Sequence, residues 1–311
     1  MGRIFGPVAS RRLGRSLGID VIPYKTCSFD CVYCECGGTT DLSVERKNFY
    51  PAGDILEELE ARLGQMKENP DILTLSGAGE PTLYLGMGEL ISGMKDLSGI
   101  PVAVITNSSL ISREDVRGEL SLADIVVPSL DAATPTCFER INRPHPSIRL
   151  EDIIDGLTRF IEGYRGEVRL EILLVEGYNT DMENLEGLKT IVSGLDIASI
   201  QLNTAVRPGT TGDANALSHE RMEEIRAMFG DRCEIVANVS SKARHEDASA
   251  SENILSMIER RPCTAADISA ALGLGVPQTI KLMDSMIASE RVVTESKEGM
   301  TWYIASDRTS T

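Results

Sequence analysis

Short apolar runs alternate with amphipathic stretches along most of the chain. The apolar runs predict six strands, at residues 17–22, 72–76, 102–106, 125–130, 168–175 and 199–203. The stretches between them predict helices, as at 55–66, where Leu56, Leu59 and Leu63 share one face. Repeated strand–helix alternation predicts an α/β fold, an open, partial (β/α)6 TIM-like barrel with function at the C-terminal strand ends. A flat doubly wound sheet is the alternative, although the glycine-rich turn that usually follows its first strand is missing.

The pattern changes near residue 240. Residues 240–251 are polar and lack periodicity, which predicts a linker. Beyond them the sequence predicts helices at 253–260, 264–272 and 277–289, a turn at 273–275, and short strands at 292–294 and 301–304. Thr264 and Asp267 match a capping box at the start of the second of these helices. This order predicts a winged helix, so we expect two domains, residues 1–245 and 246–311.

Charge and composition narrow the class of partners. The 311 residues carry a formal net charge of −16. Such a surface repels the phosphate backbone of nucleic acids, which disfavours bulk binding of DNA or RNA. The sequence has no run of eighteen apolar residues and no basic-then-apolar start, so we expect a cytoplasmic protein without a membrane span.

Four of the seven cysteines lie within ten residues, at Cys27, Cys31, Cys34 and Cys36. An odd number with this clustering indicates metal or redox chemistry rather than a disulfide framework. Soft thiolates suit iron–sulfur clusters or zinc. Cys27, Cys31 and Cys34 could bind three irons of a cubane and leave the fourth iron open. The alternatives are a structural zinc site with Cys36 as fourth ligand and a fully ligated electron-transfer cluster.

A glycine-rich turn follows the second predicted strand, with the sequence Ser76-Gly77-Ala78-Gly79-Glu80-Pro81-Thr82. Its glycines allow the backbone to approach a ligand closely, and its proline stiffens the turn. The carboxylate of Glu80 could accept hydrogen bonds from an ammonium group. The alternative is a plain turn that leads into the next helix.

Polar residues also mark the ends of later strands. Alternation places Ser129 and Asp131 on one face of the fourth strand, which we expect to point into the barrel, and Asn107 follows the third strand. Glu171 lies in an apolar strand, where either a ligand or pairing with Arg169 would offset the cost of burying a carboxylate. Other candidates for the inner face are Gln201 and Asn203. Basic residues that could bind an anion or form internal ion pairs are Arg11, Arg12, Arg15, Arg140, Arg143, His145 and Arg207.

The cysteine spacing, with aromatic Tyr33 before the last cysteine, resembles the signature of the radical S-adenosylmethionine superfamily. Residues 6–20 are similar to a branch of iron–sulfur oxidoreductases distantly related to enzymes that make the wybutosine base of tRNA. The glycine-rich turn resembles the family's Gly-Gly-Glu-Pro motif, with Ala78 inserted before Gly79. The resemblance covers most of residues 1–245.

This resemblance implies a [4Fe–4S] cluster on Cys27, Cys31 and Cys34, with S-adenosylmethionine bound at the open iron. It implies cofactor contacts from Tyr33, Gly77, Gly79, Glu80, Pro81, Asn107, Ser129 and Asp131. It also implies reductive cleavage of S-adenosylmethionine to a 5′-deoxyadenosyl radical that abstracts hydrogen from a substrate. The electron would come from a low-potential donor similar to ferredoxin or flavodoxin.

The substrate class stays open at this point. The winged helix and acidic surface favour a peptide or protein, and the wybutosine relatives indicate a tRNA base as the alternative. The predicted recognition helix at 277–289 has Lys281 as its only cation, so we expect a protein-docking or substrate-presenting module rather than a DNA reader. A different class would be a winged-helix regulator that senses through an iron–sulfur or zinc centre with Cys36 as a ligand.

Overall fold

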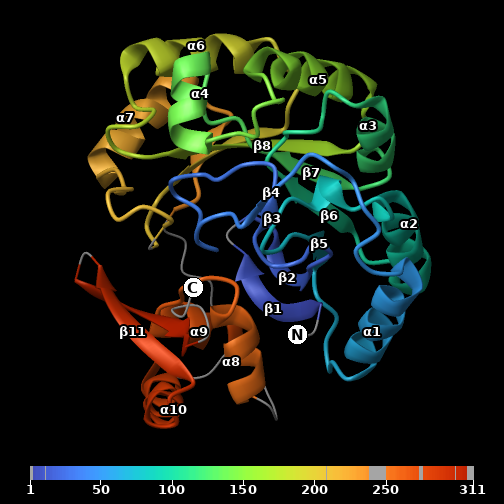
Figure 1. Ribbon diagram of the computed structural model, residues 1–311, viewed down its shortest axis with the longest axis vertical. Coiled ribbons are helices and arrows are strands. Elements are labelled where there is room, and N and C mark those ends of the chain that lie inside the picture. The colour runs from blue at the N-terminus through green and yellow to red at the C-terminus, as the bar shows by residue number, and fades with distance from the viewer. Residues whose placement is uncertain are drawn as a thin grey trace.

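The computed structural model describes residues 3–10, 12–207, 209–237, 250–272, 276–297 and 299–306. Its largest feature is an eight-stranded sheet (Figure 1). In spatial order the strands are β1 (Ile4–Ser10), β2 (Gly14–Ile19), β5 (Ile72–Leu75), β6 (Val102–Thr106), β7 (Ile125–Pro128), β8 (Glu167–Leu174), β9 (Ser199–Thr204) and β10 (Cys233–Ile235). Neighbouring strands from β2 to β10 are parallel, whereas β1 runs antiparallel to β2. Within the described residues β1 and β10 do not pair, so the sheet is open.

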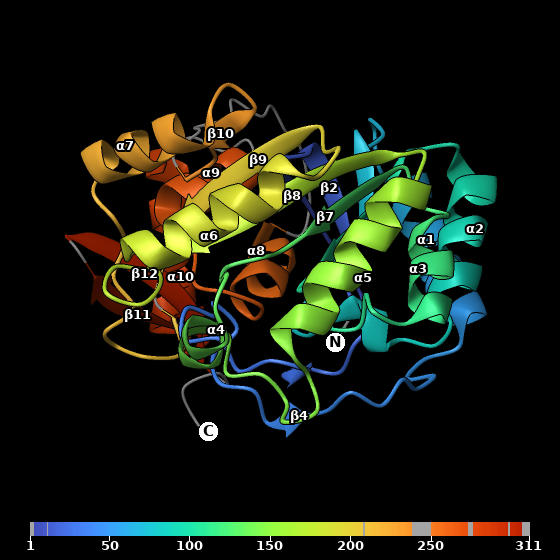
Figure 2. The ribbon, with the colours of Figure 1, turned by 90° about the horizontal axis from the view of Figure 1, so that it is seen from above.

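Helices connect the parallel strands and form an arc around the sheet in Figure 1, and in Figure 2 α6 lies in front of β8 and β9. They are α1 (Ala52–Gly64), α2 (Met87–Ser98), α3 (Glu114–Leu120), α4 (Pro135–Asn142), α5 (Leu150–Gly163), α6 (Met182–Ser193) and α7 (His219–Phe229). Shorter elements are β3 (Thr26–Cys27), β4 (Asp41–Leu42) and the 3-10 helix η1 (Pro81–Leu83). Among the described helices, none combines the length and the apolar character needed to cross a membrane.

The α/β fold with a mostly parallel sheet, predicted from the sequence, is confirmed. The six predicted strands correspond to β2 and β5 to β9, with ends shifted by at most three residues. Two further strands of this sheet, β1 and β10, were not predicted. Gly6 and Pro7 interrupt the apolar pattern of β1, and a proline is tolerated there because β1 is an edge strand. The other, β10, has three residues and adds a seventh parallel strand to the six expected.

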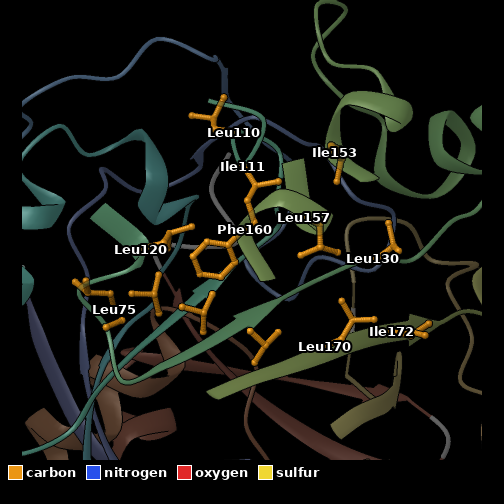
Figure 3. Packing of buried hydrophobic residues seen from close by; sticks show 14 of the residues in the cluster. Leu75, Leu110, Ile111, Leu120, Leu130, Ile153, Leu157, Phe160, Leu170 and Ile172 are labelled. Atoms are coloured by element: carbon orange, nitrogen blue, oxygen red, sulfur yellow. The ribbon is translucent and has the colours of Figure 1, made fainter. Parts of the chain in front are cut away.

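The main core lies between the sheet and the helices. Leu157 and Phe160 of α5 pack in one buried cluster with Leu170 of β8 (Figure 3). Val126 of β7 belongs to this core, while its neighbour Val127 points to the other face. There a smaller buried cluster is formed by Leu13, Ile72, Ala103 and Val127. Each such side chain contributes about 1.5–3 kcal/mol when fully buried, so the two clusters fix which residues point inward at the strand ends.

The C-terminal part has its own small core. Its elements are α8 (Ala250–Ile258), α9 (Ala265–Leu272), α10 (Val276–Ala288) and an antiparallel hairpin of β11 (Val292–Lys297) and β12 (Met300–Ala305). Thr264 Oγ1 accepts from Asp267 N–H at 3.1 Å and Asp267 Oδ2 accepts from Thr264 N–H at 2.9 Å, which confirms the capping box. Helices α8 and α9 contact β1, as Figure 1 shows. Of the predicted linker, residues 240–249 lie outside the described residues, as does the turn at 273–275, and α8 already begins at Ala250.

Candidate cofactor site

Four cysteines, Cys27, Cys31, Cys34 and Cys36, lie in the segment after β2 at residues 27–37, which we call the cysteine loop. Cys27 ends β3, and a turn follows in which Cys34 N–H donates to Cys31 O at 3.1 Å. Val32 N–H donates to Ile141 O at 3.0 Å, which joins the loop to the end of α4. The backbone of the cysteine loop is therefore fixed by hydrogen bonds of the chain itself.

The thiols of Cys27, Cys31 and Cys34 lie close enough to affect one another. Burial, followed by the nearby Glu80 carboxylate, raises the pKa of Cys27 to about 12, and Cys34 adds to this rise. Burial and the charges of Cys34 and Cys27 also raise the pKa of Cys31 well above its ordinary value. Three soft ligands that repel one another as thiolates fit a cationic cluster, because its charge would offset that repulsion.

Two side-chain amides point at these sulfurs. Asn107 Nδ2 lies 3.5 Å from Cys27 Sγ, and Asn142 Nδ2 lies 3.5 Å from Cys31 Sγ. Hydrogen bonds to cluster sulfurs are one of the means by which a protein tunes an iron–sulfur centre. Within the described part of the chain, no three His, Cys, Asp or Glu side chains are grouped so as to hold a single metal ion. A cubane does not need such a grouping, because each cysteine binds a different iron. Ligation by Cys36, the alternative that the sequence left open, stays untested.

The glycine loop, residues 76–81, follows β5 and meets the cysteine loop. A Cβ atom on Gly77 would lie 2.0 Å from Asp20 Oδ1, and one on Gly79 would lie 2.1 Å from Thr26 O. Neither position has room for a side chain, so the two glycines allow the loops to approach each other. Pro81 begins η1, where the fixed φ of proline suits the first helical position.

Glu80 is buried and joins the glycine loop to the end of β6. Its Oε1 accepts from Thr82 N–H at 3.0 Å and from Thr106 O–H at 2.6 Å, while Oε2 accepts from Asn107 N–H at 2.8 Å. Burial raises the pKa of Glu80, and these hydrogen bonds oppose the rise. The sequence predicted that Glu80 holds an ammonium group. In the structure its oxygens are bonded to the chain, and a contact with a cofactor stays a prediction.

Asp131, just beyond β7, forms a second anchor of the cysteine loop. Tyr33 O–H donates to Asp131 Oδ2 at 2.5 Å, Asn142 Nδ2 donates to the same oxygen at 2.8 Å, and Leu173 N–H donates to Oδ1 at 2.8 Å. Burial is the main reason that the pKa of Asp131 rises to about 6, and the hydrogen bonds from Tyr33 and Asn142 act against it. Tyr33 and Asp131 were both predicted to contact a cofactor, and the structure shows that they contact each other.

The structure brings most of the predicted strand-end residues together. Ser129 O accepts from Ser108 Oγ at 2.8 Å, and Asn107 Nδ2 donates to Ser28 Oγ at 3.0 Å. A small cavity beside them is lined by Phe29, Asn107, Ser129, Leu130, Asp131, Ala132, Phe138, Asn142, Leu150 and Ile153. Asn107, Ser129 and Asp131 therefore line the same cavity as Asn142, which was not predicted from the sequence.

Glu171 lies on the inner face of the sheet, as its alternation in β8 predicts, but its partner differs from the expected one. Arg12 Nη1 lies 2.5 Å from Glu171 Oε2, and Asn203 Nδ2 donates to Oε1 at 2.9 Å. Arg169 instead pairs with Glu167 at 2.7 Å. Pairing of Glu171 with Arg169, one of the two alternatives left open by the sequence, is not observed, because Arg12 in the turn between β1 and β2 pairs with Glu171 while Arg169 donates to Arg12 O at 2.6 Å. Gln201 Nε2, also predicted for that face, donates to Glu234 Oε1 at 2.9 Å.

The predicted basic clusters form internal contacts. The observed partners are Glu68 for Arg15, Asp181 and the Tyr178 carbonyl for Arg140, Asp30 for Arg143, Ser147 for His145, and Glu35 with Asp267 for Arg207. Arg11 lies outside the described residues. These contacts match the ion-pair alternative that the sequence left open, and they leave the anion-binding alternative untested.

Sequence reasoning missed Asn142, Thr106 and Asp20. Each is polar and buried or half-buried beside a loop that carries a predicted ligand. A local signal existed only for Thr106, which ends an apolar strand directly before Asn107. Asn142 reaches Cys31 across 111 positions of the sequence, and no local pattern indicates such a contact.

Comparison with known proteins places the chain in a family. The sequence matches the radical SAM superfamily over residues 21–187. It is 38% identical over 228 residues to a UPF0026 protein of Methanocaldococcus jannaschii, covering 73% of this chain and 71% of that one. A UPF0026 protein of Helicobacter pylori is 29% identical over 305 residues and covers 97% of both chains. The chain is also 36% identical over 305 residues to "GTPase Obg" of Brachyspira hyodysenteriae, with 97% of this chain covered, but it spans only 45% of that protein.

Solved structures of low sequence identity share the fold. A radical SAM methyltransferase from Sphaerobacter thermophilus has a TM-score of 0.53 at 18% identity, over 71% of this chain and 65% of that one. Streptococcus suis SuiB bound to S-adenosylmethionine has a TM-score of 0.51 at 18% identity, over 71% of this chain and 50% of that one. The match over residues 21–187 includes the cysteine loop, the glycine loop and the ends of β6 and β7. The chain therefore belongs to the radical SAM superfamily.

Proposed function

We propose that this radical SAM enzyme holds a [4Fe–4S] cluster on Cys27, Cys31 and Cys34 and binds S-adenosylmethionine at the remaining iron. The observation that carries the proposal is the grouping of three mutually interacting thiols with amides at 3.5 Å from two of the sulfurs. When bound, these cofactors supply reductive cleavage of S-adenosylmethionine to a 5′-deoxyadenosyl radical that abstracts hydrogen from a substrate. The protein's own contribution is to hold and orient the reacting groups.

We assign cofactor binding to the loops at one edge of the parallel sheet. The glycine loop follows β5, Asn107 follows β6, and Ser129 and Asp131 follow β7. Because the C-terminal ends of parallel strands meet at the same edge, these groups can surround one ligand. The carboxylates of Glu80 and Asp131 hold the neighbouring loops through the hydrogen bonds described above. Gly77 and Gly79 let the glycine loop pack against Asp20 and Thr26, and we propose that the backbone of this loop contacts the methionyl part of the cofactor.

We further propose that residues 246–311 form a winged helix. Support comes from the order of three helices followed by an antiparallel hairpin, with a separate buried core. The exposed side chains described on α10 include Val276, Ile280 and Asp284. An apolar and acidic face of this kind suits protein docking better than contact with DNA phosphates.

The substrate class in this proposal is a peptide or protein, with a tRNA base as the alternative. The acidic character of the whole chain, with a net charge of −16, favours the first. A ferredoxin- or flavodoxin-like donor would supply the low-potential electron, and a cytoplasmic location would suit such a donor. Incubation with candidate substrates and transfer of deuterium from substrate to 5′-deoxyadenosine would identify the target.

The test of the central claim is anaerobic reconstitution with iron and sulfide, followed by reduction in the presence of S-adenosylmethionine. We expect a cluster whose electron paramagnetic resonance signal changes when S-adenosylmethionine binds, together with formation of 5′-deoxyadenosine. Cys31→Ala should lose both the iron and the cleavage, because an open cubane depends on each of its three cysteines. Cys233→Ala, at a buried position of β10, is the matched control and should keep both. Full iron content and cleavage in Cys31→Ala would overturn the ligand assignment.

A further inference from the structure

Two consecutive arginines follow α8 and lie beside the cofactor site: Arg261 contacts the cysteine loop, and Arg260 contacts Asp20, which supports the glycine loop. Arg260 Nε lies 3.6 Å from Asp20 Oδ2, with both side chains largely buried. Arg261 Nη1 lies 3.6 Å from Glu35 Oε2. Glu35 stands between Cys34 and Cys36 in the cysteine loop. The C-terminal part thus contacts this loop directly, from a segment more than 220 positions away in the sequence.

Asp20 carries the contact of Arg260 onward to the glycine loop. Its carboxylate accepts from Ala78 N–H at 3.2 Å and from Ile22 N–H at 3.3 Å. The same carboxylate occupies the space that a side chain on Gly77 would fill. A displacement of Asp20 would therefore leave the glycine loop without its support on that side.

Glu35 also pairs with Arg207, which lies in the segment after β9. Arg207 Nη1 lies 2.9 Å from Glu35 Oε1, and Arg207 Nη2 lies 3.3 Å from Asp267 Oδ1 of α9. The Arg207 guanidinium is buried beside the ring of Trp302 at 6.0 Å. The Arg207 guanidinium, in the segment after β9, thus joins the cysteine loop to α9 through two carboxylates, Glu35 and Asp267.

Stability alone is a poor explanation for the Arg260–Asp20 pair. Burial is the main reason that the pKa of Asp20 is raised and that of Arg260 is lowered, so the loss of water outweighs the mutual attraction for both groups. Buried ion pairs often give no more stability than apolar side chains of the same size. What the pair does provide is placement, because the buried Arg260 guanidinium lies over the Phe5 ring of β1 at 4.2 Å while its Nε stays 3.6 Å from the Asp20 carboxylate.

We propose that Arg260 and Arg261 are positioning residues of the cofactor site, through which the C-terminal domain sets the placement of the glycine loop and the cysteine loop. The proposal rests on the proposed function for the identity of the ligand, but the loop placement belongs to the chain alone. Since the arginines act on both loops, docking of the C-terminal domain and binding of S-adenosylmethionine are thermodynamically linked. A partner that pulls this domain away would weaken cofactor binding.

The experiment compares Arg260→Gln and Arg261→Gln with Arg261→Lys and with Arg291→Gln, a change of an exposed arginine in the same domain. Hydrogen exchange of residues 27–37 and 76–81 is measured without added iron, and the Kd for S-adenosylmethionine is measured on the reconstituted protein. We expect faster exchange in residues 76–81 for Arg260→Gln and in residues 27–37 for Arg261→Gln. Their Kd should rise by about 5- to 150-fold, the usual range of coupling between sites. Arg261→Lys should recover part of the loss, and Arg291→Gln should match the unaltered chain.

Unchanged exchange in both loops, or an unchanged Kd, in glutamine variants that fold would overturn the proposal. If Arg260→Gln does not fold, Arg261→Gln and Arg261→Lys decide the outcome alone, because Arg261 is half-buried at the domain surface. Failure of the unaltered chain to bind iron or S-adenosylmethionine would reject the proposed function instead. The exchange measurement would still judge the positioning role in that case.

Discussion

Gly79→Ala is the substitution for which the structure makes the sharpest prediction. The new Cβ would lie 2.1 Å from Thr26 O and 2.5 Å from Ile22 Cγ2, whereas Cβ contacts under 3.0 Å are essentially never observed. Thr26 O is a backbone atom directly before Cys27, so it cannot rotate away as a side chain would. The 2.1 Å separation falls short of the 3.0 Å limit by roughly 0.9 Å, so the glycine loop and the cysteine loop must move apart by that distance.

The cost of this separation has two parts. Overpacking of a filled site costs about 1–3 kcal/mol. The hydrogen bond from Glu80 N–H to Thr26 O, 3.3 Å long, would also be strained or lost, at about 0.5–1.5 kcal/mol. We therefore expect Gly79→Ala to lower the free energy of unfolding by about 2–4 kcal/mol. Displacement of Glu80 should also disturb its bonds to Thr106 and Asn107, and hence cluster assembly.

Urea unfolding followed by circular dichroism measures the stability, and iron and sulfide analysis after reconstitution measures assembly. Gly118→Ala in α3 is the matched control, because a Cβ there would meet nothing within 4 Å. Alanine in a helix is favoured over glycine, so the control should gain up to about 1 kcal/mol and keep its iron. The two variants should thus shift in opposite directions. A Gly79→Ala protein as stable as the unaltered chain and equally rich in iron would refute the steric reasoning.

Two further predictions concern buried charges. The pKa of Asp131 is raised to about 6 by burial, above its value in the unfolded chain, so the free energy of unfolding should fall by about 3 kcal/mol as the pH rises from about 4 to 6. Urea titrations across this range should show the fall, and Asp131→Asn should remove this pH dependence; an equal slope in the variant would contradict the assignment. Arg46 is buried, with Nε donating to Thr82 O at 2.8 Å and Nη2 donating to Tyr84 O at 2.9 Å, so Arg46→Met should cost about 3–5 kcal/mol. Exposed Arg149→Met should cost less than about 1 kcal/mol in the same assay, and a loss that small at Arg46 would contradict the reasoning.

Local patterns were sufficient to predict six of the eight strands of the main sheet and the faces of their residues. Period-2 alternation in β8 predicted that Glu171 points away from the main core, and the structure agrees because Leu170 and Ile172 belong to that core. The cysteine spacing likewise indicated the family, since a short motif of one loop carries that signal. Features that depend on residues close together in the sequence, such as strand faces and short motifs, could therefore be predicted.

The side-chain partners of these residues could not be predicted in the same way. Arg12 pairs with Glu171 across 159 positions, and Tyr33 bonds to Asp131 across 98. These pairs depend on how the turn between β1 and β2 and the cysteine loop fold over the sheet, and no periodicity encodes that. The cofactor contact predicted for Asp131 stays a prediction, whereas its hydrogen bond from Tyr33 appears only in three dimensions.

The two outer strands of the sheet bear on how readily two molecules could pair edge to edge. A free strand edge offers unpaired N–H and C=O groups to the edge of another molecule, and such addition can continue into fibres. On one side β10 is three residues long, too short to template much pairing. On the other side α8 and α9 lie against β1 and shield it. Helices α8 and α9 therefore also protect the β1 edge from pairing with a second molecule. We expect a chain cut before these helices to aggregate.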